Sequence, residues 1–438
     1  MFLTTTILAT SILTSPQDTQ IESLTKLVQE LRNEVSELKN SNSDNWINNQ
    51  RADEVRALVH DILADADTRA SLLSDGISAG YDGGAFLTSA DGNWKLKING
   101  QLQVRWLYND AEGRSSESGF EQRRTKITFS GHVIDPSWTY KISPTWSRSG
   151  GSDTLDAYIQ KKFDGGSWFK FGQFKQSFLR ENSVSSSKQL TVERSMLNNA
   201  FTYGWSQGIE FGWNNEDLKL LVQYTDGPGQ KDTEALGTTT NAWVARAEFR
   251  FGEADWKEFN YLTSKAGAKN GLLLGVSYEN YSRETGNTFE YGNAGGTKSN
   301  GWTVDASWRG DGWNMLGYIV DTTGSTGGVD QDSSGWLVQG GFLVNDNTEL
   351  FAQYQEGKVT GESMDMDAFR LGFNYWPSAG SNTIKWTTDI GWAGKTLTDG
   401  AGGGISSADW VSPGNGWRED SGTNKDQMLI RSQLQLLF

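Results

Sequence analysis

The sequence predicts an all-β protein, a 16-stranded antiparallel transmembrane β-barrel preceded by a short α-helical coiled-coil stalk. Polar and apolar residues alternate with period two through sixteen segments, as in strands with one apolar and one polar face. The connections between these segments alternate between short turns and long loops, which would place the short turns at one end of a barrel and the long loops at the other. The composition combines Gly 51, Trp 19 and Phe 20 with Pro 6 and Cys 0, which favours an aromatic-rich β protein.

The first residues do not share this alternation. Residues 2–14 are apolar and resemble the core of a secretory signal, although no Lys or Arg precedes them and no Ala-x-Ala site follows. We expect residues 1–15 to be a signal segment, with a start farther upstream as the alternative.

Residues 16–90 are predicted to form a periplasmic coiled-coil stalk and linker. β-branched residues at heptad position a and Leu at position d repeat over three heptads: Ile21, Leu24, Val28, Leu31, Val35 and Leu38. A second helix is expected over residues 48–73, followed by a glycine-rich linker that begins at Gly76. This choice of core residues favours a two-stranded coil.

Residues 91–438 are predicted to form the barrel. The sixteen expected strands cover residues 94–108, 120–133, 137–147, 154–163, 167–175, 205–214, 217–226, 241–252, 270–283, 300–309, 312–321, 334–345, 348–357, 366–376, 382–393 and 426–438. Connections after even-numbered strands are mostly tight turns, with the link 253–269 as the exception. Connections after odd-numbered strands are mostly long and rich in Gly, Ser and Asp. The last strand alternates up to a terminal Phe438, like the closing strand of a bacterial outer-membrane barrel.

Composition excludes several functions. The formal net charge of −15 argues against nucleic acid as a partner, and the absence of Cys removes thiol chemistry and thiolate metal sites. Only His60 and His132 are available as catalytic histidines, and neither has supporting partners in the sequence. We therefore expect no enzyme activity, no catalytic residues, no metal site and no cofactor.

Four stretches resemble the phosphate-selective porin O/P family of trimeric, sixteen-stranded outer-membrane channels: Gln122–Gly131, Lys170–Phe178, Gln189–Ser195 and Arg370–Trp376. With the terminal strand, the likeness spans residues 94–438 and leaves the N-terminal coil as an addition. Proline is usual in the family where this chain has Ser177. The resemblance implies a bacterial outer-membrane location and a homotrimer, which conflicts with the two-stranded preference of the coil.

Strand alternation assigns a facing direction to each charged residue, because lipid-facing positions must be apolar. The predicted pore-lining, anion-binding bases are Lys95, Lys97, Arg105, Arg124, Lys126, Lys141, Lys162, Lys219, Arg246, Arg250, Arg309, Arg370, Lys385 and Arg431. The predicted opposing acids are Asp156, Glu210, Glu248, Glu279, Asp305 and Asp389. Such an excess of bases attracts anions, unless the bases pair with these acids and with loop carboxylates.

The connection 176–204 stands where porins commonly fold a loop inward to form the constriction. Its candidates, counted from the end of the preceding strand, are Lys175, Arg180, Lys188 and Arg194. Serine hydroxyls and arginine forks in such a loop are suitable donors for phosphate oxygens.

We therefore predict an outer-membrane porin, a passive diffusion channel with a cationic lumen that favours anions, with phosphate as one candidate. Its expected partners are inorganic anions or small anionic solutes, outer-membrane lipid, two further copies of the chain, and the cell wall through the stalk. The alternative is a barrel anchor whose coiled coil tethers the outer membrane to the cell wall. A secreted, Trp-rich carbohydrate-binding β protein is a third reading, which solubility without detergent would support.

Overall fold

The computed structural model describes residues 25–36, 76–146, 148, 150–202, 204–227, 240–283, 297–326, 329–359, 365–397, 410–421 and 424–438. The chain divides into two units, Met1–Asp75 and Gly76–Phe438. In the first unit, residues 25–36 are helical and lie inside the predicted coil, while the signal segment and the second predicted helix lie outside the described residues. No described helix is long and apolar enough to cross a membrane.

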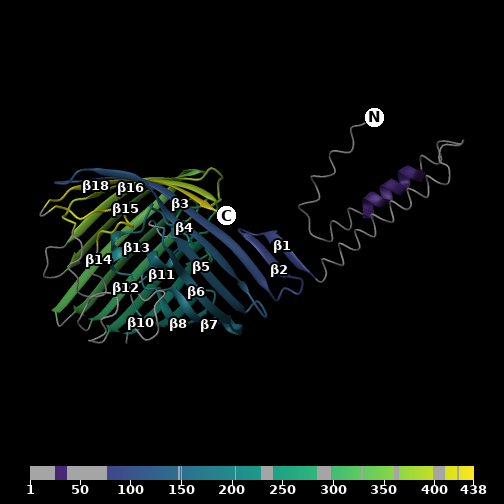
Figure 1. Cartoon of the computed structure of the whole chain (residues 1–438), viewed down its shortest axis with the longest axis horizontal. Coiled ribbons are helices and arrows are strands. Elements are labelled where there is room, and N and C mark those ends of the chain that lie inside the picture. The colour runs from purple at the N-terminus through teal and green to yellow at the C-terminus, as the bar shows by residue number, and fades with distance from the viewer. Residues whose placement is uncertain are drawn as a thin grey trace. The chain divides into compact units, whose positions relative to one another are not determined.

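The second unit is a closed antiparallel barrel of sixteen strands (Figure 1). Its strands are β3 (Lys95–Ala111), β4 (Glu117–His132), β5 (Trp138–Trp146), β6 (Ser152–Lys162), β7 (Ser167–Lys175), β8 (Trp205–Asn214), β9 (Leu218–Thr225), β10 (Thr240–Gly252), β11 (Gly271–Arg283), β12 (Thr297–Gly310), β13 (Trp313–Thr326), β14 (Val329–Asn345), β15 (Thr348–Val359), β16 (Met366–Tyr375), β17 (Ile384–Ala393) and β18 (Gln427–Leu437). Each strand pairs with the next, and β18 pairs with β3 to close the barrel. All sixteen predicted strands are confirmed.

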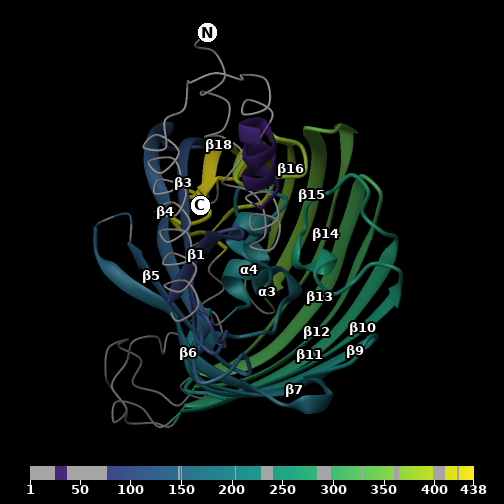
Figure 2. The ribbon, with the colours of Figure 1, turned by 90° about the vertical axis from the view of Figure 1, so that its right-hand side faces the viewer.

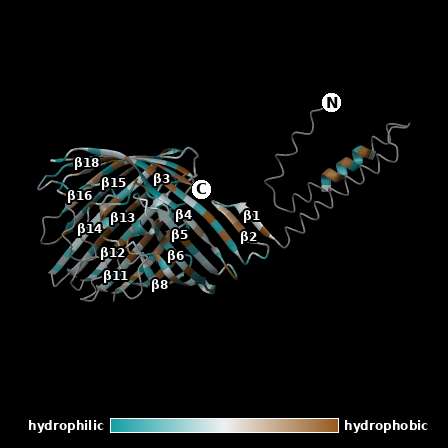
Figure 3. Ribbon diagram, in the orientation of Figure 1, coloured by the Kyte–Doolittle hydropathy of each residue, from teal (hydrophilic) through white to brown (hydrophobic). Residues whose placement is uncertain are grey.

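The alternation in the sequence becomes two faces of the wall. Large apolar side chains such as Phe171, Leu220 and Leu434 are exposed on the outside, at 63%, 42% and 56%. Polar side chains such as Gln103, Arg431 and Gln433 are buried. Figure 3 shows the resulting bands of hydrophobic and hydrophilic residues along the strands. An apolar outer wall around a polar interior is the arrangement that lipid requires of a barrel.

The predicted glycine-rich linker is wrong in one respect, because part of it is folded. β1 (Ile77–Tyr81) and β2 (Ala85–Ser89) form a hairpin, and β2 pairs with β3 between Lys95 and Ile98. β18 occupies the same edge of β3 only from Gln101 onward. The hairpin therefore covers the part of the β3 edge that the end of the chain leaves unpaired.

The connection between β7 and β8, residues 176–204, folds into the barrel and is called the inward loop here. It carries α3 (Arg180–Ser183), the 3₁₀ turn η2 (Ser186–Lys188) and α4 (Met196–Ala200). Figure 2 shows α3 and α4 inside the ring of strands. The backbone N–H of Val192 donates to Asp389 on β17 at 3.0 Å, and that of Met196 donates to Gln355 on β15 at 2.9 Å. The loop thus reaches strands on the far side of the barrel.

Candidate functional site: a cation-lined passage inside the barrel

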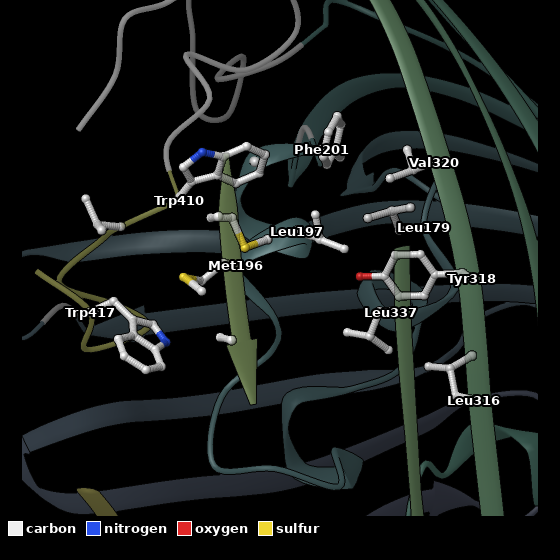
Figure 4. Close-up of a cluster of buried hydrophobic side chains, with 14 of the residues drawn as sticks. Leu179, Met196, Leu197, Phe201, Leu316, Tyr318, Val320, Leu337, Trp410 and Trp417 are labelled. Atoms are coloured by element: carbon white, nitrogen blue, oxygen red, sulfur yellow. The ribbon is translucent and has the colours of Figure 1, made fainter. Parts of the chain in front are cut away.

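The inward loop fills one side of the barrel with an apolar cluster (Figure 4). Leu179, Met196 and Leu197 of the loop pack against wall residues that include Leu337 and Val320. All of these side chains are at most 3% exposed. Burial of this much apolar surface fixes the loop against the wall, since each buried aliphatic side chain contributes about 1.5–3 kcal/mol.

The link 253–269 between β10 and β11 supports the loop from the short-turn end. Its 3₁₀ turn η3 (Glu258–Asn260) lies beside Arg309, whose Nη1 and Nη2 donate to the carbonyls of Tyr261 and Thr263, each at 3.1 Å. The backbone N–H of Leu262 donates to the carbonyl of Lys188 at 2.9 Å. The link 253–269, the one long connection predicted among the tight turns, therefore helps the inward loop to fill the barrel interior.

The other side of the barrel, along β4 to β8, is open. A cavity of about 550 Å³, called the long-loop cavity here, lies between these strands and the inward loop. Its lining contains eight cationic side chains: Arg123, Arg124, Lys126, Lys141, Arg148, Lys170, Lys175 and Arg194. It contains three acidic ones, Asp153, Asp156 and Glu210, together with the hydroxyls of Ser183, Ser185 and Ser186. The excess of positive charge makes this the strongest candidate for an anion site in the described structure.

A second cavity, of about 520 Å³, continues toward the tight turns and is called the short-turn cavity. Its lining reaches Phe163 and Gly166 at the β6–β7 turn and Asn214 at the end of β8. Lys162, Lys170 and Lys219 contribute positive charge to it, against Glu210. The two cavities share lining residues and together follow one wall of the barrel from the long loops to the short turns.

Glu193 of the inward loop anchors the arginines at the edge of the long-loop cavity. Both of its oxygens accept from Arg124 at 2.8 Å, and Arg123 and Arg105 approach to 2.7 and 3.1 Å. Burial alone would raise the pKa of Glu193, but the three arginines outweigh it and hold the pKa well below its usual range. The carboxylate therefore stays charged, and it ties the loop to β3 and β4.

Residues 410–417 of the connection between β17 and β18 cover the same arginines from the other side. The carbonyl of Pro413 accepts from Arg148 at 2.7 Å, and that of Gly414 accepts from Arg123 at 3.2 Å. The carbonyl of Asn415 accepts from Arg431 at 2.7 Å. Three consecutive backbone carbonyls thus occupy donors that would otherwise face the lumen.

Seven of the cations predicted from the sequence line one of the two cavities. In the long-loop cavity they are Arg124, Lys126, Lys141, Lys175 and Arg194, and in the short-turn cavity they are Lys162 and Lys219. Three of them have carboxylate partners: Arg124 binds Glu193 at 2.8 Å, Lys141 contacts Asp156 at 2.8 Å, and Lys219 contacts Glu248 at 3.1 Å.

The other predicted bases do not line these two cavities. Several are buried beneath the loops and bind carboxylates or backbone carbonyls: Arg105, Arg180, Arg246, Arg309, Arg370, Lys385 and Arg431. The Nζ of Lys188 lies over the ring of Tyr261 at 4.1 Å. Lys95 and Lys97 lie beside the β1–β2 hairpin, and Arg250 contacts Asp217 at the β8–β9 turn. For this group, the prediction of facing direction did not extend to what covers each side chain.

Three cavity cations were missing from the prediction: Arg123, Arg148 and Lys170. Arg123 is the extra residue of a β-bulge, since Gln103 pairs with Arg124 and the next residue, Val104, pairs with Gln122. The sequence carried a signal for the bulge. Apolar Phe120 and charged Arg124 are four residues apart and would lie on the same face of a regular strand, so the alternation must shift by one residue between them. In the structure Phe120 is on the outside and 82% exposed.

The comparisons with known proteins agree with this geometry. Residues 95–379 match the model of the family described as phosphate-selective porin O and P. A search of curated proteins found no match. Among solved structures, an anion-selective porin from Comamonas acidovorans is similar at 12% identity and a TM-score of 0.54, covering 78% of this chain and 99% of that one. The trimer form of OmpT from Vibrio cholerae is similar at 11% identity and a TM-score of 0.55, covering 78% and 99%. The outer-membrane channel DcaP of Acinetobacter baumannii is similar at 11% identity and a TM-score of 0.53, covering 82% and 100%.

A closed sixteen-stranded barrel with an apolar outer wall and a loop folded into its lumen defines the class of outer-membrane porins, which are channels and not enzymes. Within that class, the chain belongs to the phosphate-selective porin O and P family.

Proposed function

We propose that this porin is a passive diffusion channel that favours anions. The observation that carries the proposal is the charge of the long-loop cavity, which has eight cationic and three acidic side chains in its lining. A narrow passage with positive walls concentrates anions and raises their rate of entry. The whole chain has a net charge of −15, so the excess of cationic side chains in this cavity is a local property of the passage.

Phosphate is the anion that the donor set suits best among inorganic ions. Arg194 presents a guanidinium group, Lys126 presents an ammonium group, and Ser183, Ser185 and Ser186 present hydroxyls to the same cavity. Planar guanidinium donors bind phosphate oxygens in pairs, and hydroxyl donors complete a tetrahedral shell. Small organic anions with a phosphate or carboxylate group would use the same donors.

The test is reconstitution of the full chain into planar bilayers. We expect a reversal potential on the chloride side across a KCl gradient, and a reduction of the chloride current when phosphate is added at low concentrations. A reversal potential on the potassium side would overturn the anion preference. Anion preference without any effect of phosphate would leave a general anion channel and reject phosphate.

The N-terminal unit supports a second proposal, oligomerisation through the stalk. Leu31 and Val35 occupy heptad core positions in the helix 25–36, and in the single chain they are 50% and 46% exposed. Exposed apolar residues at these positions favour a partner helix from another copy. We propose a homotrimer, with the stalk in the periplasm, where it is also available to contact the cell wall.

Deletion of residues 21–38 separates the channel from the tether. A channel keeps its single-copy conductance without the stalk, and a tether loses attachment of the outer membrane to the cell wall. Cross-linking of the intact protein distinguishes three copies from two. Unchanged attachment and unchanged subunit number after the deletion would remove both roles from the stalk.

A further inference from the structure

The long-loop and short-turn cavities meet at one place. Of all their lining residues, only Lys170, Ser177 and Glu210 belong to both. Lys170 is on β7, Glu210 is opposite it on β8, and Ser177 begins the inward loop. These three residues are called the neck here. A solute that moves from one cavity to the other along this wall must pass them.

The carboxylate of Glu210 is held at the neck by three donors. Lys170 Nζ donates to Oε1 at 2.6 Å, and Trp168 Nε1 donates to the same oxygen at 2.8 Å. Gln223 Nε2 donates to Oε2 at 2.6 Å, and its Oε1 accepts from the backbone N–H of Ser177 at 2.9 Å. Glu210 is only 4% exposed, so its charge is screened from the passage by its partners.

The ammonium group of Lys170 is placed differently. It lies 5.1 Å from the centroids of both Tyr158 and Phe174, and it contacts Glu210 on one side. An ammonium has three N–H donors, and the described contacts give Lys170 one hydrogen bond, to Glu210. Its side chain is 14% exposed, compared with 5% for Glu210, so the cation is the more accessible member of the pair.

We propose that the neck is the selectivity filter of this channel, in which Lys170 and the hydroxyl of Ser177 contact the passing anion and Glu210 is a positioning residue for Lys170. This inference rests on the proposed function. Lys170 and Glu210 together have no net charge. The remaining N–H groups of Lys170 face the passage, whereas the Glu210 carboxylate already accepts three hydrogen bonds. A passing anion gains hydrogen bonds at the neck, whereas a cation meets an ammonium and a carboxylate with no free partner for it.

The charge arm of the test uses two charge-neutralising variants, Glu210→Gln and Lys170→Gln, and measures reversal potentials across a KCl gradient. Glu210→Gln removes the countercharge and is expected to raise the chloride-to-potassium permeability ratio roughly two- to fourfold, the effect of one unit charge at about 5–8 Å in water. Lys170→Gln is expected to lower the ratio by a similar factor. Lys97→Gln is the matched control, because Lys97 lies beside the hairpin and is expected to leave the ratio unchanged.

The position arm uses the absence of native cysteine. Ser177→Cys introduces a single thiol at the neck, and a negatively charged methanethiosulfonate reagent is expected to reduce the current in steps after it reacts. Ser378→Cys is the control, since Ser378 is exposed in the β16–β17 turn. Blockade at position 378 and none at position 177 would overturn the placement of the neck.

The outcomes separate this inference from the proposed function. A cation-selective wild type whose two charge variants still shift in opposite directions would reject anion preference and keep the neck. An anion-selective wild type with no shift in either charge variant would keep the function and reject the neck. Unchanged open-channel lifetimes in Ser177→Cys before labelling show that the passage is intact, so blockade reports position and not misfolding.

Discussion

The ring of Phe438, the last residue, lies directly over Gly100 on the neighbouring strand β3. A Cβ atom built on Gly100 would stand 2.1 Å from Cζ of that ring. The two residues also exchange backbone hydrogen bonds, with N···O distances of 2.6 and 3.1 Å. Gly100 therefore provides the space in which the terminal side chain closes the barrel.

Gly100→Ala is expected to displace the Phe438 ring and lower the stability of the closed barrel by about 1 kcal/mol. The measurement is the temperature at which the purified barrel loses its compact mobility in SDS gels. Gly119→Ala on β4 is the matched control, because a Cβ there meets no atom within 4 Å. If the Phe438→Ala variant loses further stability on addition of Gly100→Ala, the two residues do not act through this contact.

Lys126→Gln is expected to lower the chloride-to-potassium permeability ratio roughly two- to fourfold, because Lys126 lines the long-loop cavity at a distance where one charge matters in water. Reversal potentials in a KCl gradient give the ratio. Arg250→Gln should leave it unchanged, since Arg250 is bound to Asp217 at the short-turn rim. Equal effects of both substitutions would mean that selectivity reflects total charge and not the cavity.

Glu193→Gln is expected to release the inward loop, with a loss of about 3 kcal/mol, because three arginines lose their common carboxylate. Frequent closures and larger current noise would be seen in single-channel records at pH 7. In the wild type, the depressed pKa of Glu193 means that its stabilisation is complete above about 4.3, the value for an unperturbed glutamate, and is lost only as the pH falls through the lower folded value. Wild-type noise should thus stay unchanged from pH 7 to pH 5, and a rise in that window would contradict the assignment.

Trp410→Ala is expected to loosen the segment 410–417 and increase conductance. The indole is fully buried and packs against Phe201 at a centroid distance of 6.1 Å, so its removal costs about 3–5 kcal/mol of local packing. Release of the segment would free Arg123 and Arg148 from its carbonyls. Trp302→Ala on the outer wall is the control, being 43% exposed. Identical conductance in both variants would show that the segment does not limit the current.

The strands could be predicted because a membrane barrel imposes period two on nearly every residue of its wall. The sixteen alternating segments, the terminal strand among them, show this period directly in the sequence. The hairpin at residues 77–89 was missed because its glycines and short length favour a linker, and its strands form only because the edge of β3 is free beside them.

The passage could be predicted only in part. Alternation indicates that Lys126 and Arg370 both face inward, but it does not indicate that the inward loop covers Arg370 and leaves Lys126 in a cavity. That difference depends on where Leu190, Met196 and Leu197 pack, which is a matter of tertiary contacts far apart in the sequence. Arg123 was missed for a local reason, since one extra residue in β4 reverses the facing of everything before it.

The apolar cluster beneath the inward loop has a consequence for how this protein can change. The inward loop, and not the barrel wall, sets the free cross-section of the channel. The sixteen strands enclose the interior, and the folded loop determines how much of it remains open. A few substitutions in the inward loop can therefore change the pore diameter while strand number, strand tilt and the outer wall stay constant. One barrel can in this way serve solutes of different size, with the inward loop as the part that varies.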